Sequence, residues 1–165
     1  MVNYHSENFS KLFFNSLDLL VQLEGLSNKV YFDTANKKTI GVGHLLTPDE
    51  LLTSKIKIRG KHIDYSLGLT TKQCHDLCRQ DLERYCEAVE DSMEVDLTQN
   101  EFDALVMFCF NVGIDAFKKS TLLKLLNQGD YKSVPEQLMR WTKAGGKDSK
   151  GLINRRNAEI KLWNS

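Results

Sequence analysis

Two carboxylates and a hydroxyl, Glu24, Asp33 and Thr39, lie within sixteen residues of one another, and Gly41-x-Gly43-His44 follows directly. Hydrolysis of a glycosidic bond uses two carboxyl groups on opposite faces of the sugar. One protonates the leaving oxygen, and the other positions or activates a water molecule. A neighbouring hydroxyl can help to hold that water. These three residues are therefore our candidates for the chemistry of glycoside hydrolysis.

The first of these carboxylates lies at the end of a predicted helix. Apolar residues recur at helical spacing over residues 6–24, which predicts an amphipathic helix. Gly25 suits the left-handed backbone conformation that ends many helices, so Glu24 lies at the helix C-terminus. The negative end of the helix dipole disfavours the charged form of a carboxyl group there, which is the direction that a general acid needs. The alternative is a solvated glutamate at a helix end.

The other two candidates lie on a predicted hairpin. Residues 30–33 and 39–42 favour strands, and residues 35–38 favour the turn between them. Asp33 therefore precedes the turn, and Thr39 opens the second strand. The alternatives are an aspartate that initiates the turn and an ordinary strand threonine. For Asp33 the two interpretations are compatible, because a turn aspartate can also face a cleft.

Helices are expected to make up most of the remaining chain. Two of them open with a threonine three residues before a glutamine or glutamate, which is the spacing of a capping box. The helix that follows Thr98 is apolar on nearly every side, so we expect it to be central and buried. Residues 53–69 alternate weakly and predict an irregular or strand-like segment. One expected helix begins at Thr47, one runs from Thr70 to about residue 91, and one runs from Thr98 to Gly113. Further helices are expected at 121–126, 134–141 and 153–163, with a loop at Gly145-Gly146.

Length and composition bound the class of protein. The chain has 165 residues, enough for one domain or two small lobes, and 41% of them are hydrophobic, which excludes a disordered chain. Residues 1–113 contain 11 Lys and Arg residues and 17 Asp and Glu residues. Residues 114–165 contain 11 Lys and Arg residues and 5 Asp and Glu residues. This asymmetry favours an anionic ligand at the C-terminal part, with a solvated surface as the equal alternative. No nucleic-acid-binding motif accompanies the basic residues, so a nucleic-acid role is not supported.

The four cysteines, Cys74, Cys78, Cys86 and Cys109, form no CxxC pair. Cys74 and Cys78 are one helical turn apart, but no further Cys or His has the spacing that completes a zinc site. We therefore expect free thiols on buried helix faces, in a reducing compartment.

The order of motifs along the chain resembles a known family. The chain contains Glu24-Gly25, then Asp33 nine residues after Glu24, and then Thr39 six residues after Asp33. Gly41-x-Gly43-His44-Leu45 follows directly. This pattern is similar to that of the phage endolysin-type lysozymes (glycoside hydrolase family 24, T-even phage lysozyme-like). The resemblance covers most of the chain beyond residue 20. Three later segments are similar to signatures of the family's C-terminal lobe: Asn111-x-Gly113, Phe117-x-x-Ser120 and Gly151-Leu152-x-x-Arg155-Arg156-x-x-Glu159.

The resemblance implies an α+β fold that is mostly α, with residues 1–165 forming a single lysozyme-like domain of two lobes. The small sheet-containing lobe would cover about residues 25–70, and a long helix near residues 71–91 would join it to the helical lobe of residues 92–165. The first helix, residues 6–24, would belong to the helical lobe. The active site would lie in a cleft between the lobes.

The implied activity is that of a muramidase, which hydrolyses the β-1,4 bond between N-acetylmuramic acid and N-acetylglucosamine in bacterial peptidoglycan. Glu24 would be the general acid, and Asp33 and Thr39 would position the attacking water in an inverting mechanism. Inversion would place the two carboxyl groups roughly 6.5–9.5 Å apart. No metal and no organic cofactor is implied.

Three residues are implied to support the site. His44 matches a residue that makes a supporting ion pair, and the acid in the matching position is Asp81 on the long helix. Arg155 would hold Glu24 in place, with Arg156 as the alternative. The other interpretation of both arginines is surface charge in the basic C-terminal part of the chain.

Further residues match positions that line the family's cleft. The polar ones would bind N-acetyl and hydroxyl groups, and the apolar ones would pack on sugar faces. For two of them, Phe110 and Phe117, packing in the core is an equal alternative. The six matching residues are Gly43, Leu45, Phe110, Asn111, Phe117 and Ser120.

The implied partner is the glycan strand of peptidoglycan, with no nucleic acid and no membrane anchor, and a monomer is expected. The N-terminal stretch is too short and polar to span a membrane, and it lacks the pattern of a signal peptide. A protein synthesised in the host cytoplasm would then need a holin or a secretion system to act in the periplasm or on the cell wall. The alternatives are a secreted antibacterial effector and a non-catalytic glycan-binding relative. The presence of Glu24, Asp33 and Thr39 together favours an enzyme.

Overall fold

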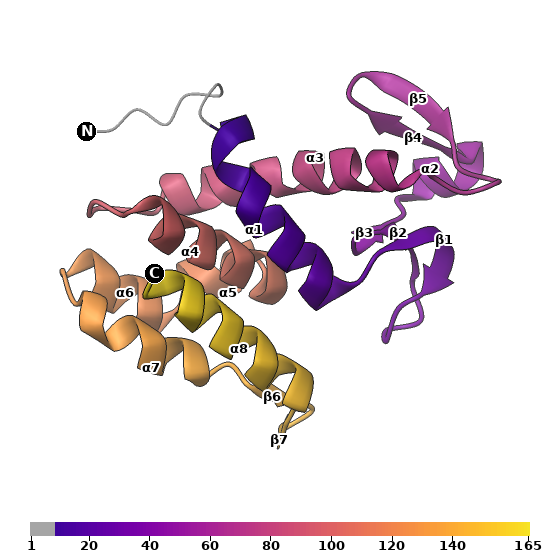
Figure 1. The fold of residues 1–165 in the computed structure, drawn as a ribbon. Helices are drawn as coiled ribbons and strands as arrows, with labels where there is room; N and C mark the ends of the chain where they lie inside the picture. The colour runs from indigo at the N-terminus through magenta and orange to yellow at the C-terminus, as the bar shows by residue number, and fades with distance from the viewer. Residues whose placement is uncertain (1–8) are drawn as a thin grey trace. The chain divides into compact units, whose positions relative to one another are not determined.

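Figure 1 shows the computed structural model, which describes residues 9–165. The chain divides into two compact units. We call residues 14–83 the sheet unit, and residues 84–165 with residues 9–13 the helical unit. The predicted beginning of the first helix, residues 6–8, lies outside the described residues. No helix within residues 9–165 has the length and apolar character needed to cross a membrane.

The predicted helix and hairpin at the start of the sheet unit are both present. α1 (Phe9–Glu24) ends where Gly25 adopts a φ of 79° and donates its N–H to Val21 O at 2.8 Å. This is the left-handed helix end that the glycine predicts. The sheet that follows is antiparallel and consists of β1 (Ser27–Phe32), β2 (Lys38–Gly41) and β3 (His44–Leu45), in that order.

The register of this sheet assigns its side chains to two faces. Tyr31 pairs with Thr39, and Thr39 pairs with Leu45, so these three side chains share one face. Ile40 pairs with His44 on the opposite face, because neighbouring residues of a strand point to opposite sides. Ile40 is fully buried in the core of the sheet unit. That core consists of Ile40, Leu46, Ile56, Ile58, Tyr65, Leu69, Cys74 and Leu77.

Residues 53–69, for which the sequence predicts an irregular or strand-like segment, contain a regular hairpin. β4 (Lys55–Ile58) and β5 (Lys61–Asp64) pair in antiparallel register. The two residues between them, Arg59 and Gly60, have φ values of 48° and 79°. Positive φ at both central positions is what a two-residue type I′ turn requires, so the weak alternation of the sequence does reflect paired strands.

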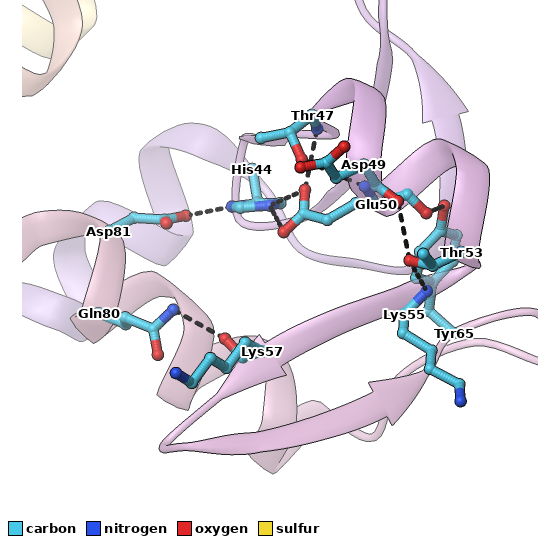
Figure 2. Close-up of polar contacts among 10 residues, drawn as sticks. All are labelled: His44, Thr47, Asp49, Glu50, Thr53, Lys55, Lys57, Tyr65, Gln80 and Asp81. Atoms are coloured by element: carbon cyan, nitrogen blue, oxygen red, sulfur yellow. Dashed lines mark hydrogen bonds and ion pairs between the residues drawn. The ribbon is translucent and has the colours of Figure 1, made fainter.

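The long helix α3 (Thr71–Glu90) confirms the helix predicted between residues 70 and 91. Its capping box is present, because Thr70 N donates to Gln73 Oε1 at 2.8 Å and Gln73 N donates to Thr70 Oγ1 at 3.1 Å. The helix also holds the second hairpin: Gln80 Nε2 donates to Lys57 O at 2.9 Å, as Figure 2 shows.

A buried carboxylate on α3 fixes the turn of the same hairpin. Asp76 has a side chain that is only 7% exposed, and its Oδ1 lies 2.8 Å from the guanidinium of Arg59. Lys72 Nζ lies 2.9 Å from Oδ2, and Arg79 Nη1 lies 3.4 Å from Oδ1. Three cations thus compensate one buried negative charge and tie the hairpin to the helix.

α4 (Gln99–Val112) is the buried helix of the helical unit. Thr98 caps it, since Glu101 N donates to Thr98 Oγ1 at 3.3 Å and Thr98 N donates to Glu101 Oε2 at 2.7 Å. Every residue from Phe102 to Cys109 is buried, as the apolar sequence predicts. Gly113 ends the helix with a φ of 90°.

The last helix begins earlier than predicted. α8 (Lys150–Trp163) starts at residue 150 rather than 153, because Ser149 Oγ accepts a hydrogen bond from Leu152 N at 3.4 Å and caps it. α8 packs along α4 and α7. Arg155 and Arg156 therefore lie inside this helix, and both are buried.

The helical unit also contains short elements, some of which the sequence does not predict. α6 (Thr121–Asn127) and α7 (Val134–Met139) confirm the two predicted short helices. Five-residue and two-residue elements show too few repeats for a periodic pattern to reveal them. These unpredicted elements are α5 (Ile114–Lys118), η1 (Tyr131–Ser133) and the hairpin of β6 (Lys143–Ala144) and β7 (Lys147–Asp148), whose turn is Gly145-Gly146.

Candidate active site

Asp33 is held at the start of the turn between β1 and β2. Its Oδ1 accepts hydrogen bonds from Ala35 N at 2.9 Å and from Lys37 N at 2.8 Å. Its backbone N–H donates to Lys37 O at 2.9 Å. The aspartate therefore does initiate the turn. No described residue donates a hydrogen bond to Oδ2, so one carboxylate oxygen orients the group while the other can accept from a ligand or water.

Thr39 lies on the central strand, with Tyr31 and Leu45 on either side of it on the same face. It is 2% exposed. Its Oγ1 donates a hydrogen bond to Lys37 O at 3.1 Å. Because the hydroxyl proton is used in this contact, the lone pairs of Oγ1 can accept a hydrogen bond from a water molecule.

Glu24 is the last residue of α1 and is half-buried. Its negative charge affects the pKa of two residues in the sheet unit, Tyr31 and Cys78. Burial first, and then the carboxylates of Glu24 and Asp33, raise the pKa of the Tyr31 phenol. Burial first, and then the charges of Asp81 and Glu24, raise the pKa of the Cys78 thiol to about 12.

Tyr31 is a further candidate for the site, which the sequence reasoning missed. It lies directly across from Thr39 in the sheet and two residues before Asp33. Residues two apart in a strand point to the same side, so alternation along β1 was a signal that could have found it. With its pKa raised, the phenol keeps its proton at neutral pH and can donate a hydrogen bond beside the two carboxylates.

His44 makes the contact with Asp81 that the resemblance implies. Figure 2 shows His44 between two acids: Nδ1 lies 2.8 Å from Asp81 Oδ2, and Nε2 lies 3.1 Å from Glu50 Oε2. Burial lowers the pKa of His44, but the hydrogen bonds and charges of Asp81 and then Glu50 outweigh it, so the pKa is raised overall. The protonated imidazole can donate to both acids at once.

Glu50 is the second residue that the sequence reasoning missed. It belongs to α2 (Pro48–Thr53), where Thr47 and Glu50 form a capping box. Glu50 Oε2 accepts from Thr47 N at 2.9 Å and also contacts His44. The predicted helix start at Thr47 was the available signal, because it fixes Glu50 within the first turn. His44 thereby joins β3, α2 and α3.

The remaining predicted residues of the sheet unit are accessible. Gly43 is exposed, has a φ of 74°, and has no atom within 4 Å of the place where a side chain would begin. Leu45 is 48% exposed and flanks Thr39. Both stay candidates for contact with a glycan.

Two of the predicted glycan-binding residues in the helical unit are enclosed. Phe117 is 0% exposed and lies edge-on to Phe108, with their ring centroids 6.3 Å apart. Ser120 is 6% exposed, and its Oγ accepts from Leu123 N at 3.1 Å to cap α6. These contacts support core packing for Phe117 and a capping role for Ser120.

Phe110 and Asn111 are half-buried residues near the end of α4. The Phe110 ring lies edge-on to Tyr85, with the centroids 5.1 Å apart. Asn111 Oδ1 accepts a hydrogen bond from Arg156 Nη2 at 2.6 Å. Arg156, the alternative to Arg155 as the partner of Glu24, is engaged within the helical unit. Arg155 is 5% exposed on α8, and its role beside Glu24 stays a prediction.

All four cysteines are buried and none forms a disulfide, which confirms the expectation of buried thiols. Burial raises the pKa of Cys109 to about 11, and that of Cys78 is higher still. Thiols with such pKa values are protonated and unreactive at neutral pH.

Comparisons with known proteins show which family the chain is similar to. The sequence model of one protein family, described as Phage lysozyme, matches residues 21–159. The chain is 37% identical over 151 residues to an endolysin of Bacillus phage PZA, covering 90% of this chain and 53% of the relative. It is 39% identical over 145 residues to a SAR-endolysin of Escherichia phage Mu, covering 88% of this chain and 76% of the relative.

A solved structure gives the same result for the fold. The muramidase domain of SpmX from Asticaccaulis excentricus is similar with a TM-score of 0.75 and 30% sequence identity, covering 92% of this chain and 96% of that chain. The match covers only part of some of these relatives. The chain spans about half the length of the endolysins of Bacillus phages PZA and B103, 53% and 51% respectively.

Proposed function

Because the chain belongs to the phage lysozyme family, we propose that it is a muramidase. It hydrolyses the β-1,4 bond between N-acetylmuramic acid and N-acetylglucosamine in bacterial peptidoglycan. The observation that carries this proposal is the placement of the three candidates within the sheet unit: Glu24 ends α1, Asp33 is held at the start of the hairpin turn, and Thr39 lies on the central strand. Tyr31 lies directly across the sheet from Thr39.

In this proposal Asp33 and Thr39 hold the attacking water. Asp33 Oδ1 is bound to two backbone N–H groups, which leaves Oδ2 to accept one water proton. Thr39 Oγ1 has donated its own proton to Lys37 O, so it accepts the other. With both protons engaged, a lone pair of the water oxygen is available for the anomeric carbon. Asp33 takes the proton that the water loses as the new C–O bond forms.

Glu24 completes the reaction as the general acid. It gives its proton to the glycosidic oxygen as the bond between that oxygen and the anomeric carbon breaks. The water attacks from the opposite face, so the configuration at the anomeric carbon inverts. An inverting enzyme needs roughly 6.5–9.5 Å between the two carboxyl groups to leave room for the water. The β-linked substrate would then release an α-configured N-acetylmuramic acid end.

The stereochemistry of the product tests this mechanism. Proton NMR of fresh digests of purified peptidoglycan should show the α-anomer before mutarotation mixes the two forms. Asp33→Asn should lower the rate by about 100-fold or more, the usual effect of losing a general base. Asp49→Asn, which changes an exposed acid at the start of α2, is the matched control and should leave the rate unchanged. A β-anomer as the first product would overturn the inverting mechanism.

We further propose that the protein acts as a monomer and reaches the cell wall with the help of a holin or a secretion system. Relatives named endolysin and SAR-endolysin support action on the wall from inside a bacterial host. Light scattering of the purified protein tests the monomer. Expression in cells that lack a holin, a secretion system or both tests the route, and lysis that is equally fast without either of them would contradict it.

A further inference from the structure

The hairpin of β4 and β5 carries a local excess of positive charge. Residues 55–61 contain four basic residues and no acid, although residues 1–113 together contain more acids than bases. Three of the four are exposed lysines. The fourth, Arg59, is still 61% exposed although it binds Asp76, and two further cations contact the same carboxylate. The hairpin and the first half of α3 therefore form a basic surface in an acidic part of the chain.

The lysines lie on the outer face of the hairpin and beside its turn. Lys55 pairs with Asp64 and Lys57 pairs with His62, and all four residues are exposed. The residues between the two lysines and the turn point to the opposite side of β4, where they are buried in the core of the sheet unit. Lys61 comes directly after the turn and is exposed too. The hairpin therefore presents three ammonium groups to its surroundings.

Two leucines that are almost fully exposed flank the open end of the same hairpin. Leu52 lies three residues before β4 and is 85% exposed, and Leu67 lies three residues after β5 and is 93% exposed. Just beyond the last strand pair, Tyr65 N donates to Ser54 O at 3.1 Å. The two chain segments that carry the leucines are therefore held together at this end of the hairpin.

The protein holds both leucine-bearing segments by hydrogen bonds. Gly68 N donates to Tyr65 O at 2.8 Å, which closes a β-turn with Leu67 at its third position. Tyr65 and Leu69, on either side of this turn, are buried. α2 has no buried residue, but its capping box and the hydrogen bond from Tyr65 Oη to Glu50 O at 2.9 Å keep it in place (Figure 2). Each leucine is thus exposed on a segment that the fold anchors.

The combination of lysines and leucines identifies the chemistry of a partner. A solvated surface or a soluble anionic polymer would account for the lysines, but neither would cover the leucines. One isolated leucine on a surface needs no explanation, whereas here two of them flank three exposed lysines. An anionic lipid surface matches both kinds of side chain. Its phosphates attract the lysines, and the leucines leave water for the boundary between headgroups and acyl chains.

We propose that the β4–β5 hairpin, together with Leu52 and Leu67, docks the protein reversibly on a bilayer that contains anionic lipids. We call these residues the docking surface. They all belong to the sheet unit, and none of them is a candidate for the catalytic site. A bilayer is broad, so the residues need not converge on a pocket. The inference does not depend on the proposed function, because it concerns a lipid and not a glycan.

Sedimentation with sucrose-loaded vesicles tests the docking. The full chain should bind vesicles made of equal parts of phosphatidylglycerol and phosphatidylcholine. Binding to vesicles of phosphatidylcholine alone should be about 100-fold weaker, since each of the three lysines contributes roughly a five-fold factor on an anionic surface. Added salt should weaken binding to the mixed vesicles. Equal binding to both kinds of vesicle, or no binding to the mixed ones, would refute the proposal.

Two pairs of substitutions separate the ionic from the apolar contribution. Lys57→Gln/Lys61→Gln should weaken binding to the mixed vesicles by about 25-fold. Leu52→Ser/Leu67→Ser should weaken it by about ten-fold or more, because the variant loses the apolar area that enters the bilayer. Both variants should keep the melting temperature, since the four side chains are exposed. Full binding by the leucine variant, or binding of wild type to dextran sulfate but not to vesicles, would show an attraction to anionic polymers and refute docking on a bilayer.

The helical unit supplies the matched controls. Lys143→Gln/Lys147→Gln removes two exposed lysines from the β6–β7 hairpin. Met139→Ser removes an exposed apolar side chain. Each control should change vesicle binding by less than about two-fold, because charges beyond a Debye length are screened. Losses as large as those of the variants in the docking surface would contradict its location.

A tryptophan at position 67 reports contact with the acyl chains. The two native tryptophans, Trp141 and Trp163, lie in the helical unit. With mixed vesicles whose acyl chains are brominated, the fluorescence of Leu67→Trp should be quenched more strongly than that of wild type. Equal quenching of the two proteins, both bound to the vesicles, would show that Leu67 stays in water and would overturn the proposal.

Discussion

Replacing His44 with leucine removes the cation between two acids and keeps a similar side-chain volume. Asp81 and Glu50 have side chains that are 20% and 17% exposed, so solvent compensates their charges only in part. A hydrogen bond to a charged group contributes about 1.5–3 kcal/mol. Because partial exposure weakens each contact, we expect a total loss of about 2–3 kcal/mol in the free energy of unfolding. For a chain of this size, each kcal/mol lowers the melting temperature by roughly 2–4 °C.

The loss should depend on pH in a defined direction. Burial lowers the pKa of His44, but Asp81 and Glu50 raise it overall above its ordinary value of 6.5. A raised pKa in the folded state means that the stabilisation is fully present below the unfolded pKa and disappears as the pH rises through the folded pKa. The difference between wild type and His44→Leu should therefore be largest near pH 5.5 and smaller at alkaline pH.

Urea unfolding followed by circular dichroism at several pH values measures this difference. His62→Leu is the matched control, because His62 is exposed on β5, and its effect should be small at every pH. A difference for His44→Leu that grows as the pH rises would refute the assignment of a protonated His44 between two acids. So would an effect no larger than that of His62→Leu.

Three further predictions concern single positions. Asp76→Asn should lower the free energy of unfolding in urea by about 1–3 kcal/mol at neutral pH. Burial raises the pKa of Asp76, but Lys72 and the nearby arginines lower it overall. The stabilisation from this carboxylate is therefore present above the pKa of the unfolded state and is lost as the pH falls through the pKa of the folded state. A difference in unfolding free energy between wild type and Asp76→Asn that persists unchanged in acid would contradict this. Gly68→Ala should cost about 1–3 kcal/mol, since φ is 103° and the new Cβ would lie 2.8 Å from Asn28 O; unchanged urea unfolding would show that the loop adjusts. Tyr31→Phe should keep the melting temperature and slow peptidoglycan hydrolysis by about ten-fold, and an unchanged rate would remove the phenol from the site.

Local signals in the sequence predict much of the fold. The capping boxes at Thr70 and Thr98 and the glycines at the ends of α1 and α4 act over three or four residues, so they can be read directly. The start of α8 was wrong by three residues because its cap, Ser149, follows a glycine-rich turn that interrupts the pattern. α5 has no pattern to detect, since it occupies only five residues.

The candidate site is predictable where its residues are close in sequence. Glu24, Asp33 and Thr39 come from one helix end and one hairpin, and alternation along β1 adds Tyr31. Contacts between segments that are distant in the sequence could not be predicted in this way. The hydrogen bond from Arg156 to Asn111 joins residues 45 positions apart, and no spacing rule connects α8 to α4.

The loss of turbidity of purified peptidoglycan with wild type beside Glu24→Gln tests the central claim most directly. Glutamine keeps the size of the side chain but has no proton to give to the leaving oxygen. We expect wild type to clear the suspension and Glu24→Gln to be slower by about 100-fold or more, with matching circular dichroism spectra. Equal clearing by the two proteins, or no clearing by folded wild type, would contradict the assignment of this protein as a muramidase with Glu24 as its general acid.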